Sequence, residues 1–126
     1  MRIGAFASVV PSYDAGIAFY VGKLGFNLLE DTDMGGGKRW VVVRPSGGGS
    51  AVVLAKAVNG KQEAAIGKQT GGRVSFFLES RDFHKDHADF VAAGVLFEET
   101  PRREPYGMVA VFRDPFGNRW DLLGRS

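Results

Sequence analysis

The feature that most constrains the fold of this chain is an internal repeat. Residues 25–32 (GFNLLEDT) resemble residues 94–100 (GVLFEET) at an offset of 69 residues. Residues 44–47 (RPSG) resemble residues 114–117 (DPFG) at an offset of 70 residues. Two matches in the same order and at nearly the same offset indicate a duplicated module of about 55–60 residues.

The repeat sets the domain organisation that we expect. The first module spans residues 1–57, a linker spans 58–71, and the second module spans 72–126. One helix and four strands are too few for either module to close a hydrophobic core alone. We therefore expect one structural domain, in which the two modules curl around a shared cleft.

Both modules have the same predicted order of elements, βαβββ, which gives an α+β fold with a curved, mixed sheet. Runs rich in Val, Phe and Trp, separated by Gly or Pro, are typical of strands and turns. The strands of the first module are expected at residues 2–10, 26–30, 39–44 and 51–56. Those of the second are expected at residues 73–79, 95–99, 108–113 and 119–123, with 101–107 as a stiff, charged connection.

A helix is predicted after the opening strand of the first module. Ser12 or Asp14 can cap its start, and Gly25 stands where a left-handed residue would end it. The residues that repeat with helical period and should face the core are Ile17, Tyr20, Val21 and Leu24.

The second module predicts an equivalent helix, capped by Ser80 or Asp82 and ended by Gly94. The expected buried face consists of Phe83, His87, Phe90 and Val91. The spacing of His84 and His87 could hold a metal, but we expect both to be surface or half-buried helix residues.

Composition excludes several chemistries. The chain has 126 residues and no cysteine, so disulfides, zinc ribbons, iron–sulfur clusters and thiol nucleophiles are ruled out. The net charge is +2 and the basic residues are scattered, so we expect no nucleic-acid surface, and a small anionic ligand suits the balance better than a cationic one. The longest apolar runs fall far short of the ~20 residues that span a bilayer. We expect a cytoplasmic protein with no membrane partner.

Two motifs carry a resemblance to a known family. Residues 18–26 read AFYVGKLGF, and residues 112–122 read FRDPFGNRWDL. With the duplicated βαβββ order, they resemble the vicinal oxygen chelate superfamily. That group includes glyoxalase I, fosfomycin-resistance proteins, extradiol dioxygenases, methylmalonyl-CoA epimerase and bleomycin-resistance proteins. The resemblance covers nearly the whole chain and implies a glyoxalase-like fold, but it says little about the reaction.

Metal-using members of that family hold a divalent ion with His, Glu or Gln, and the resemblance implies where those ligands would stand here. The matching positions are Ala5, Val53 or Leu54, Arg73 and Asp121. Alanine, valine and leucine side chains offer no lone pair, and arginine is a permanent cation. One carboxylate cannot supply the several ligands that a tightly held divalent ion needs. We therefore expect no metal and no cofactor.

The resemblance instead suggests a ligand-binding site. It places Arg73 and Asp121 on strands that point into one cleft, where they would form an ion pair. Either Arg73 binds a carboxylate or phosphate of a ligand, or the pair only fills a vacated metal site. Trp40, Tyr106 and Trp120 are further candidate ligand-binding residues. Asp121 is the candidate catalytic residue, because a carboxyl in an apolar cleft can have a raised pKa.

Three functions fit these observations. The leading interpretation is a superfamily protein that binds a small anionic or aromatic molecule in the inter-module cleft, without a divalent metal. The alternative is a lyase, isomerase or dioxygenase-type enzyme with an unusual or metal-free active site. The third is a partner protein whose cleft is filled by its own side chains. The resemblance also implies a homodimer, because two chains of this family commonly complete each other's sites.

Overall fold

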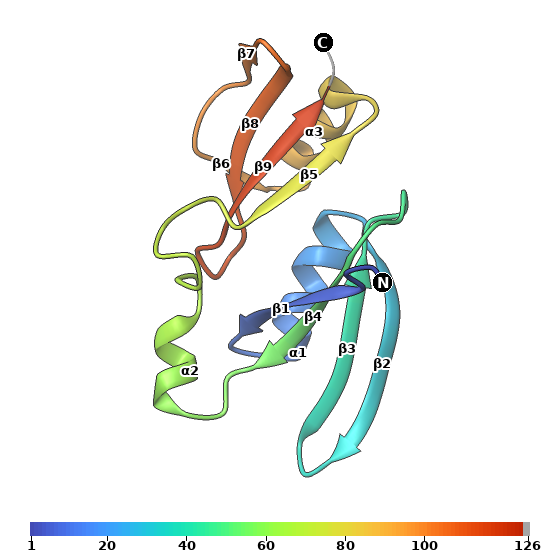
Figure 1. Cartoon of the computed structure of the whole chain (residues 1–126), viewed down its shortest axis with the longest axis vertical. Helices are drawn as coiled ribbons and strands as arrows, with labels where there is room; N and C mark the ends of the chain where they lie inside the picture. The colour runs from blue at the N-terminus through green and yellow to red at the C-terminus, as the bar shows by residue number, and fades with distance from the viewer. Residues whose placement is uncertain (125–126) are drawn as a thin grey trace. The chain divides into compact units, whose positions relative to one another are not determined.

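The computed structural model describes residues 1–124 and divides the chain into two compact units, Met1–Ile66 and Gly67–Ser126 (Figure 1). Each unit combines helices with one mixed sheet, so the predicted α+β class is confirmed. In unit 1 the first strand is followed by a helical segment and three strands, as predicted, whereas in unit 2 four strands follow the helix. Within residues 1–124, no helix is both long enough and apolar enough to cross a membrane.

Unit 1 contains a four-stranded sheet with the order β1-β4-β3-β2. β1 runs parallel to β4, and the other neighbours are antiparallel. Buried side chains of β1, β3, β4 and the helical segment form its core, among them Val10, Tyr20, Val41, Val43 and Leu54. The elements are β1 (Ala5–Val10), α1 (Tyr13–Ile17), a π-helix (Ala18–Lys23), β2 (Asn27–Gly35), β3 (Lys38–Arg44), β4 (Ala51–Lys56) and α2 (Gly60–Ala65).

The first helix differs from its prediction in an informative way. It begins as expected, with the Ser12 hydroxyl accepting from the Ala15 amide, and Gly25 has the left-handed φ of 76°. After Ile17, however, the chain continues as a π-helix. A π-helical turn shifts the phase of the buried face. Phe19, which the helical period did not select, is therefore buried beside Tyr20, with ring centroids 5.0 Å apart.

Unit 2 contains a five-stranded sheet with the path β5-β9-β8-β6, and β7 also pairs with β8. The prediction that residues 101–107 are only a connection was wrong, because Arg102–Glu104 pair with Gly107–Val109 of β8. A three-residue charged strand next to proline has no apolar alternation to reveal it. The elements are β5 (Phe76–Ser80), α3 (Phe83–Ala92), β6 (Leu96–Phe97), β7 (Arg102–Glu104), β8 (Gly107–Arg113) and β9 (Arg119–Gly124).

α3 covers one face of the unit 2 sheet, and Figure 1 shows it behind the strands. The Asp82 carboxylate accepts from the Lys85 amide and caps the helix, and Gly94 ends it with a φ of 87°. Phe83 and Phe90 are buried as predicted, whereas Val91 is 53% exposed because it lies on the outer side of the helix. His84 is exposed and His87 is half-buried against Phe83 and Phe97 rings, as expected of helix surface residues.

The repeated turn motif has a clear structural role in unit 2. Asp114 is buried, and its Oδ1 accepts hydrogen bonds from the amides of Phe116 and Asn118. Its Oδ2 accepts from Asn118 Nδ2 at 2.7 Å. Because an aspartate side chain that binds the backbone after it fixes a tight turn, this motif joins β8 to β9.

Candidate functional site

The face of the unit 2 sheet opposite α3, called here the open face, carries the best candidate site. Side chains alternate between the two faces of a strand, and paired residues on neighbouring strands share a face. Trp120 and Leu122 of β9 are buried on the α3 side, so Arg119, Asp121 and Leu123 lie on the open face. The register then places Phe77 and Val111 on either side of Asp121.

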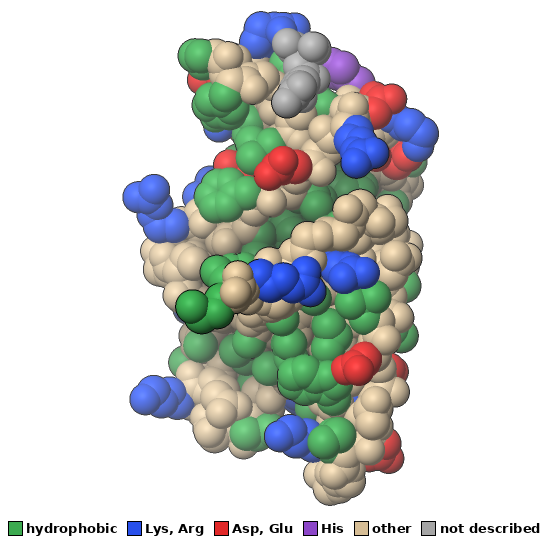
Figure 2. Space-filling model, turned by 45° about the vertical axis from the view of Figure 1, so that its right-hand side comes forward, with side chains coloured by type: hydrophobic (Ala, Val, Ile, Leu, Met, Phe, Trp, Pro, Cys, Tyr) green, Lys and Arg blue, Asp and Glu red, His purple; other side chains and the backbone are tan. Residues whose placement is uncertain are grey.

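Two large apolar side chains are exposed on the open face. Phe77 of β5 is 63% exposed, and Leu96 of β6 is 67% exposed. Leu96 pairs with Arg113, which pairs with Arg119 in the next strand. In the upper part of Figure 2, hydrophobic side chains lie beside acidic ones at the surface of the molecule. The open face therefore combines apolar contact area with charge.

Glu98 holds two arginines of the open face. Arg119 donates to both of its carboxylate oxygens, at 2.8 and 3.1 Å, and Arg113 Nε donates at 2.9 Å. Arg119 also donates to the Gly72 carbonyl oxygen at 3.1 Å. The two arginines hold the pKa of the Glu98 carboxyl below its ordinary value, chiefly through the Arg119 hydrogen bond. One carboxylate thus pairs with both guanidinium groups and offsets one of their two positive charges.

A third arginine, Arg102 of β7, is also paired. Its Nε donates to the Glu99 carboxylate at 3.1 Å, and its guanidinium contacts Glu104. Glu99 in turn accepts from the Val111 amide at 3.3 Å. Pro101 has no N–H to give, so the edge of the sheet is interrupted between β6 and β7. In this gap the Glu99 carboxylate, rather than a backbone carbonyl oxygen, accepts the hydrogen bond from the Val111 amide of β8.

Asp121 lies between these paired groups without a partner of its own. No hydrogen bond or ion pair joins its side chain to another residue in the described part of the chain, and Oδ1 is buried. Burial raises the pKa of the Asp121 carboxyl above its ordinary value, and Glu99 adds to this, while Arg102 and Arg119 oppose it. A half-buried carboxyl without a donor is costly unless something else supplies the hydrogen bond.

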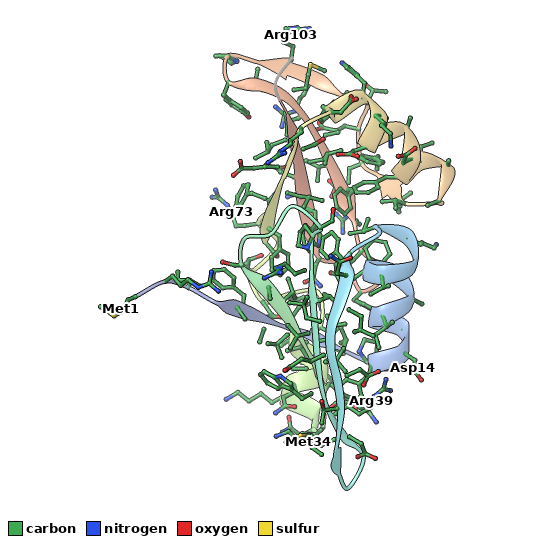
Figure 3. All side chains as sticks on the ribbon, turned by 90° about the vertical axis from the view of Figure 1, so that its right-hand side faces the viewer. Met1, Asp14, Met34, Arg39, Arg73 and Arg103 are labelled. Atoms are coloured by element: carbon green, nitrogen blue, oxygen red, sulfur yellow. The ribbon has the colours of Figure 1, made fainter. Side chains whose placement is uncertain are left out.

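Arg73 does not meet Asp121 as an ion partner, so that expectation was wrong. Arg73 lies in the turn before β5, where its amide donates to the Thr70 carbonyl oxygen. Asp121 pairs with Phe77 of β5, four residues further along the chain than Arg73. Figure 3 shows Arg73 pointing outward from its turn. The charged groups that act on Asp121 are Arg102, Glu99 and Arg119 instead.

The three predicted aromatic ligand residues have different surroundings. Trp120 is 3% exposed and lies on the α3 side of the sheet. It stacks on Phe76 and Phe112, with ring centroids 4.4 and 5.7 Å away. Tyr106 is 65% exposed in the turn that joins β7 to β8. Trp40 belongs to unit 1, where it is 43% exposed on β3. Of these three predicted residues, Tyr106 and Trp40 present a ring to solvent and Trp120 does not.

The positions that the family resemblance assigns to metal ligands do not fit a divalent ion. Ala5 is exposed on β1, Val53 is half-buried, and Leu54 is buried on the helix side of the unit 1 sheet. None of these offers a donor atom. In residues 1–124 there is no group of three His, Asp or Glu side chains placed to hold a metal. Asp121 is the one donor among the matched positions.

Unit 1 has its own charged cluster at the β2–β3 hairpin. Arg39 donates to Asp31 at 2.8 Å and to Asp14 at 2.9 Å, and its guanidinium lies over the Tyr13 ring. Figure 3 shows Arg39 next to Asp14. The Arg39 hydrogen bond lowers the pKa of the Asp31 carboxyl. A shallow hollow of about 410 Å³ beside it is lined by Asp33, Asp31, Arg39 and Gly35 to Gly37. The Arg39 guanidinium is thus engaged by two carboxylates, and the Asp14 contact ties α1 to the hairpin.

Sequence reasoning missed Phe77, Leu96 and Glu98. The alternation in residues 119–123, with Arg119 and Asp121 separated by Trp120, could have indicated a charged face opposite an aromatic one. It could not have identified the partners on other strands. The partners depend on which residues of neighbouring strands pair with each other, and this register is known only from the structure.

Comparison with known proteins agrees with this fold. Residues 2–122 match the family described as the Glyoxalase/Bleomycin resistance protein/Dioxygenase superfamily. An uncharacterized protein of Shewanella frigidimarina is 48% identical over 119 residues, which cover 93% of this chain and 88% of that protein.

Two crystal structures are similar over nearly their full length. That of UcmS2 is 29% identical with a TM-score of 0.84, and the match covers 98% of this chain and 97% of that one. That of TnmS3, described as an antibiotic binding protein from Streptomyces sp. CB03234, is 28% identical with a TM-score of 0.79, covering 100% and 97%. The chain belongs to the glyoxalase/bleomycin resistance protein/dioxygenase superfamily.

Proposed function

We propose that this protein binds a small aromatic molecule on the open face of the unit 2 sheet, without a divalent metal, and does not transform it. The observation that carries the proposal is the row Phe77–Asp121–Val111. It sets an exposed ring and a buried aliphatic side chain on either side of a carboxyl group that has no hydrogen-bond partner within residues 1–124. Ligand sites typically combine apolar contact area with a few polar groups that fix orientation.

The similarity to TnmS3 supports a binding role. That protein is described as antibiotic-binding, and it is 28% identical to this chain over its whole length. We extend only the general role, the capture of a small molecule, to this protein. As part of the same proposal we expect no nucleic-acid partner, because its basic residues are scattered. We also place the protein in the cytoplasm, because its apolar runs are too short to span a bilayer.

Residues outside the row extend the proposed contact area. Leu96 lies on the same face, and Tyr106 stands in the β7–β8 turn at one end of the sheet. Trp40 is the exposed aromatic of the unit 1 sheet, and we keep it as a candidate stacking residue of that unit. Trp120 is left out of the proposed site, because it is buried among Phe76 and Phe112.

One observation favours the enzymatic alternative. The raised pKa of Asp121 moves its titration toward the range in which a carboxyl can take up and release a proton during a reaction. A metal-free lyase or isomerase would use that group as its acid or base. Turnover of a bound compound that is lost in Asp121→Asn, with binding retained, would establish this alternative instead.

A binding experiment tests the proposal directly. Planar aromatic probes such as naphthol are added to isotope-labelled protein, first without and then with a chelator, and amide NMR signals are followed. We expect saturable shifts of amides in β5, β8 and β9. Phe77→Ala should weaken binding by up to about tenfold, because an aromatic pair is worth about 0.5–1.5 kcal/mol.

Val91→Ala is the matched control, since Val91 is an exposed apolar residue of α3 rather than of the open face. It should leave the affinity unchanged. The proposal is overturned if no planar aromatic probe gives saturable shifts, if the shifts map to residues outside the open face, or if a chelator abolishes binding.

A further inference from the structure

The open face carries more carboxyl groups than guanidinium groups, and this difference bears on the kind of ligand that it can bind. Three guanidinium groups, those of Arg102, Arg113 and Arg119, lie on this face. Each is joined to a carboxylate by an ion pair of the described structure. Five carboxyl groups lie on the same face or reach it, namely Glu79, Glu98, Glu99, Glu104 and Asp121.

The arginines are therefore poorly placed to receive an anion. An incoming carboxylate or phosphate would have to displace Glu98 from Arg119, where two parallel N–H···O bonds hold it. Bidentate pairs of this kind are the strong, geometrically specific ones. Displacement would also leave Glu98 next to the new anion, and like charges at close range repel each other.

Asp121 is the opposite case. Its carboxyl group has no hydrogen-bond donor within the described residues, and it is half-buried between Phe77 and Val111. Oδ1 is out of solvent contact, but the terminal torsion of an aspartate is broad and nearly two-fold, so rotation exchanges its oxygens. A donor brought by a ligand would satisfy a group that the fold leaves unsatisfied.

We infer that the ligand of the open face meets Asp121 with a hydrogen-bond donor, either a hydroxyl group on an aromatic ring or a protonated alkylamine carried by that ring, and that anions are rejected. This inference rests on the proposed function and names its ligand class. It replaces the expectation of an anionic ligand, which followed from the net charge of +2. Contacts a few ångströms apart depend on local charges, because salt screens the distant ones over about 8–10 Å.

Four probes that share one ring system test the inference: naphthol, naphthylmethylamine, naphthoate and methoxynaphthalene. They present a neutral donor, a cationic donor, an anion and a neutral group without a donor. Binding is measured by amide NMR at about pH 7, where the amine is protonated and the carboxylic acid ionised. Naphthol and the amine should bind about tenfold more tightly than methoxynaphthalene, and naphthoate most weakly.

Asp121→Ala should remove the preference for both donor probes while methoxynaphthalene keeps its affinity. Asp121→Asn, which retains an acceptor oxygen without the charge, should keep the preference for naphthol over methoxynaphthalene and lose the advantage of the amine. Glu79→Gln is the matched control, because it removes one negative charge from an exposed position of the same face. It should lower the affinity for the amine by less than about threefold, as expected for a screened surface charge.

The outcomes separate the two proposals. If all four probes bind the open face equally, or naphthoate binds best, this inference is wrong while the proposed function stands. The same holds if Asp121→Ala leaves the ranking unchanged. If none of the four probes binds, the proposed function fails and the inference fails with it.

Discussion

Asp114 shows how one side chain can determine a turn. It is 4% exposed and accepts hydrogen bonds from the amides of Phe116 and Asn118 and from the Asn118 side chain. Asp114→Ala leaves these donors buried without an acceptor, so we expect the free energy of unfolding to fall by about 3 kcal/mol. Chemical denaturation of purified protein measures the change.

Asp33→Ala is the control for this prediction. Asp33 makes the same kind of contact, accepting from the Gly35 amide at 2.8 Å, but at an exposed position where water can replace it. Its removal should change the stability by less than about 0.5 kcal/mol. Equal losses for the two variants would contradict the importance that we assign to burial.

Asp121 should make stability fall as the pH rises. Burial raises the pKa of its carboxyl in the folded state, so the folded protein binds its proton more tightly than the unfolded chain does. The contribution of Asp121 is therefore fully present below the unfolded pKa of about 3.9 and is lost as the pH rises through the raised value. Asp121→Asn should consequently be more stable than wild type at neutral pH, and the difference should shrink toward about pH 4. Denaturation curves measured across this range would refute the prediction if the variant is the less stable one at neutral pH.

At the scale of elements, the short strand β6 depends on Glu98. Only Leu96 and Phe97 pair with β8, and the Glu98 carboxylate adds contacts to Arg113 and Arg119. Because the pKa of Glu98 is lowered in the folded state, its stabilising effect is present above its unfolded pKa and lost as the pH falls through the lowered one. Glu98→Gln should therefore destabilise the protein at neutral pH and make no difference in strong acid.

Hydrogen exchange provides a second measurement for Glu98→Gln. Amide protection should fall at β6 and at the start of β9, because these segments lose their ion pairs. Lys85 and Asp89 on α3 form an exposed ion pair elsewhere in the same unit, so Asp89→Asn should leave β6 protected. Unchanged protection in Glu98→Gln would show that backbone pairing alone holds β6.

The elements differed in how well the sequence predicted them. β3, β4, β8 and β9 carry enough Val, Phe and Trp between turn residues to be located within one or two positions. The π-helix and β7 were missed, since both depend on hydrogen bonds that propensity does not encode. The second helix was right in place and cap, but Val91 was assigned to the wrong side.

For the whole molecule, the oligomeric state is the prediction to test. We expect a homodimer from the family resemblance, so sedimentation of the purified protein at micromolar concentration should give about twice the chain mass of 13.6 kDa. A single species at the chain mass across that concentration range would contradict it. The shared cleft between modules likewise stays a prediction.

The sequence by itself determined the order of all elements of the two modules except the short strand β7, and also the helix caps, the turns and the family, because these depend on residues close together in the chain. It also indicated Asp121 through the family resemblance. The tertiary structure decided which groups surround that residue. Glu98 meets Arg113 and Arg119 across 15 and 21 residues of sequence, and a register shift of one residue would turn Asp121 to the other face of its sheet. Strand pairing, which no local pattern specifies, therefore gives Arg119 a partner and leaves Asp121 without one among the residues that the structure describes.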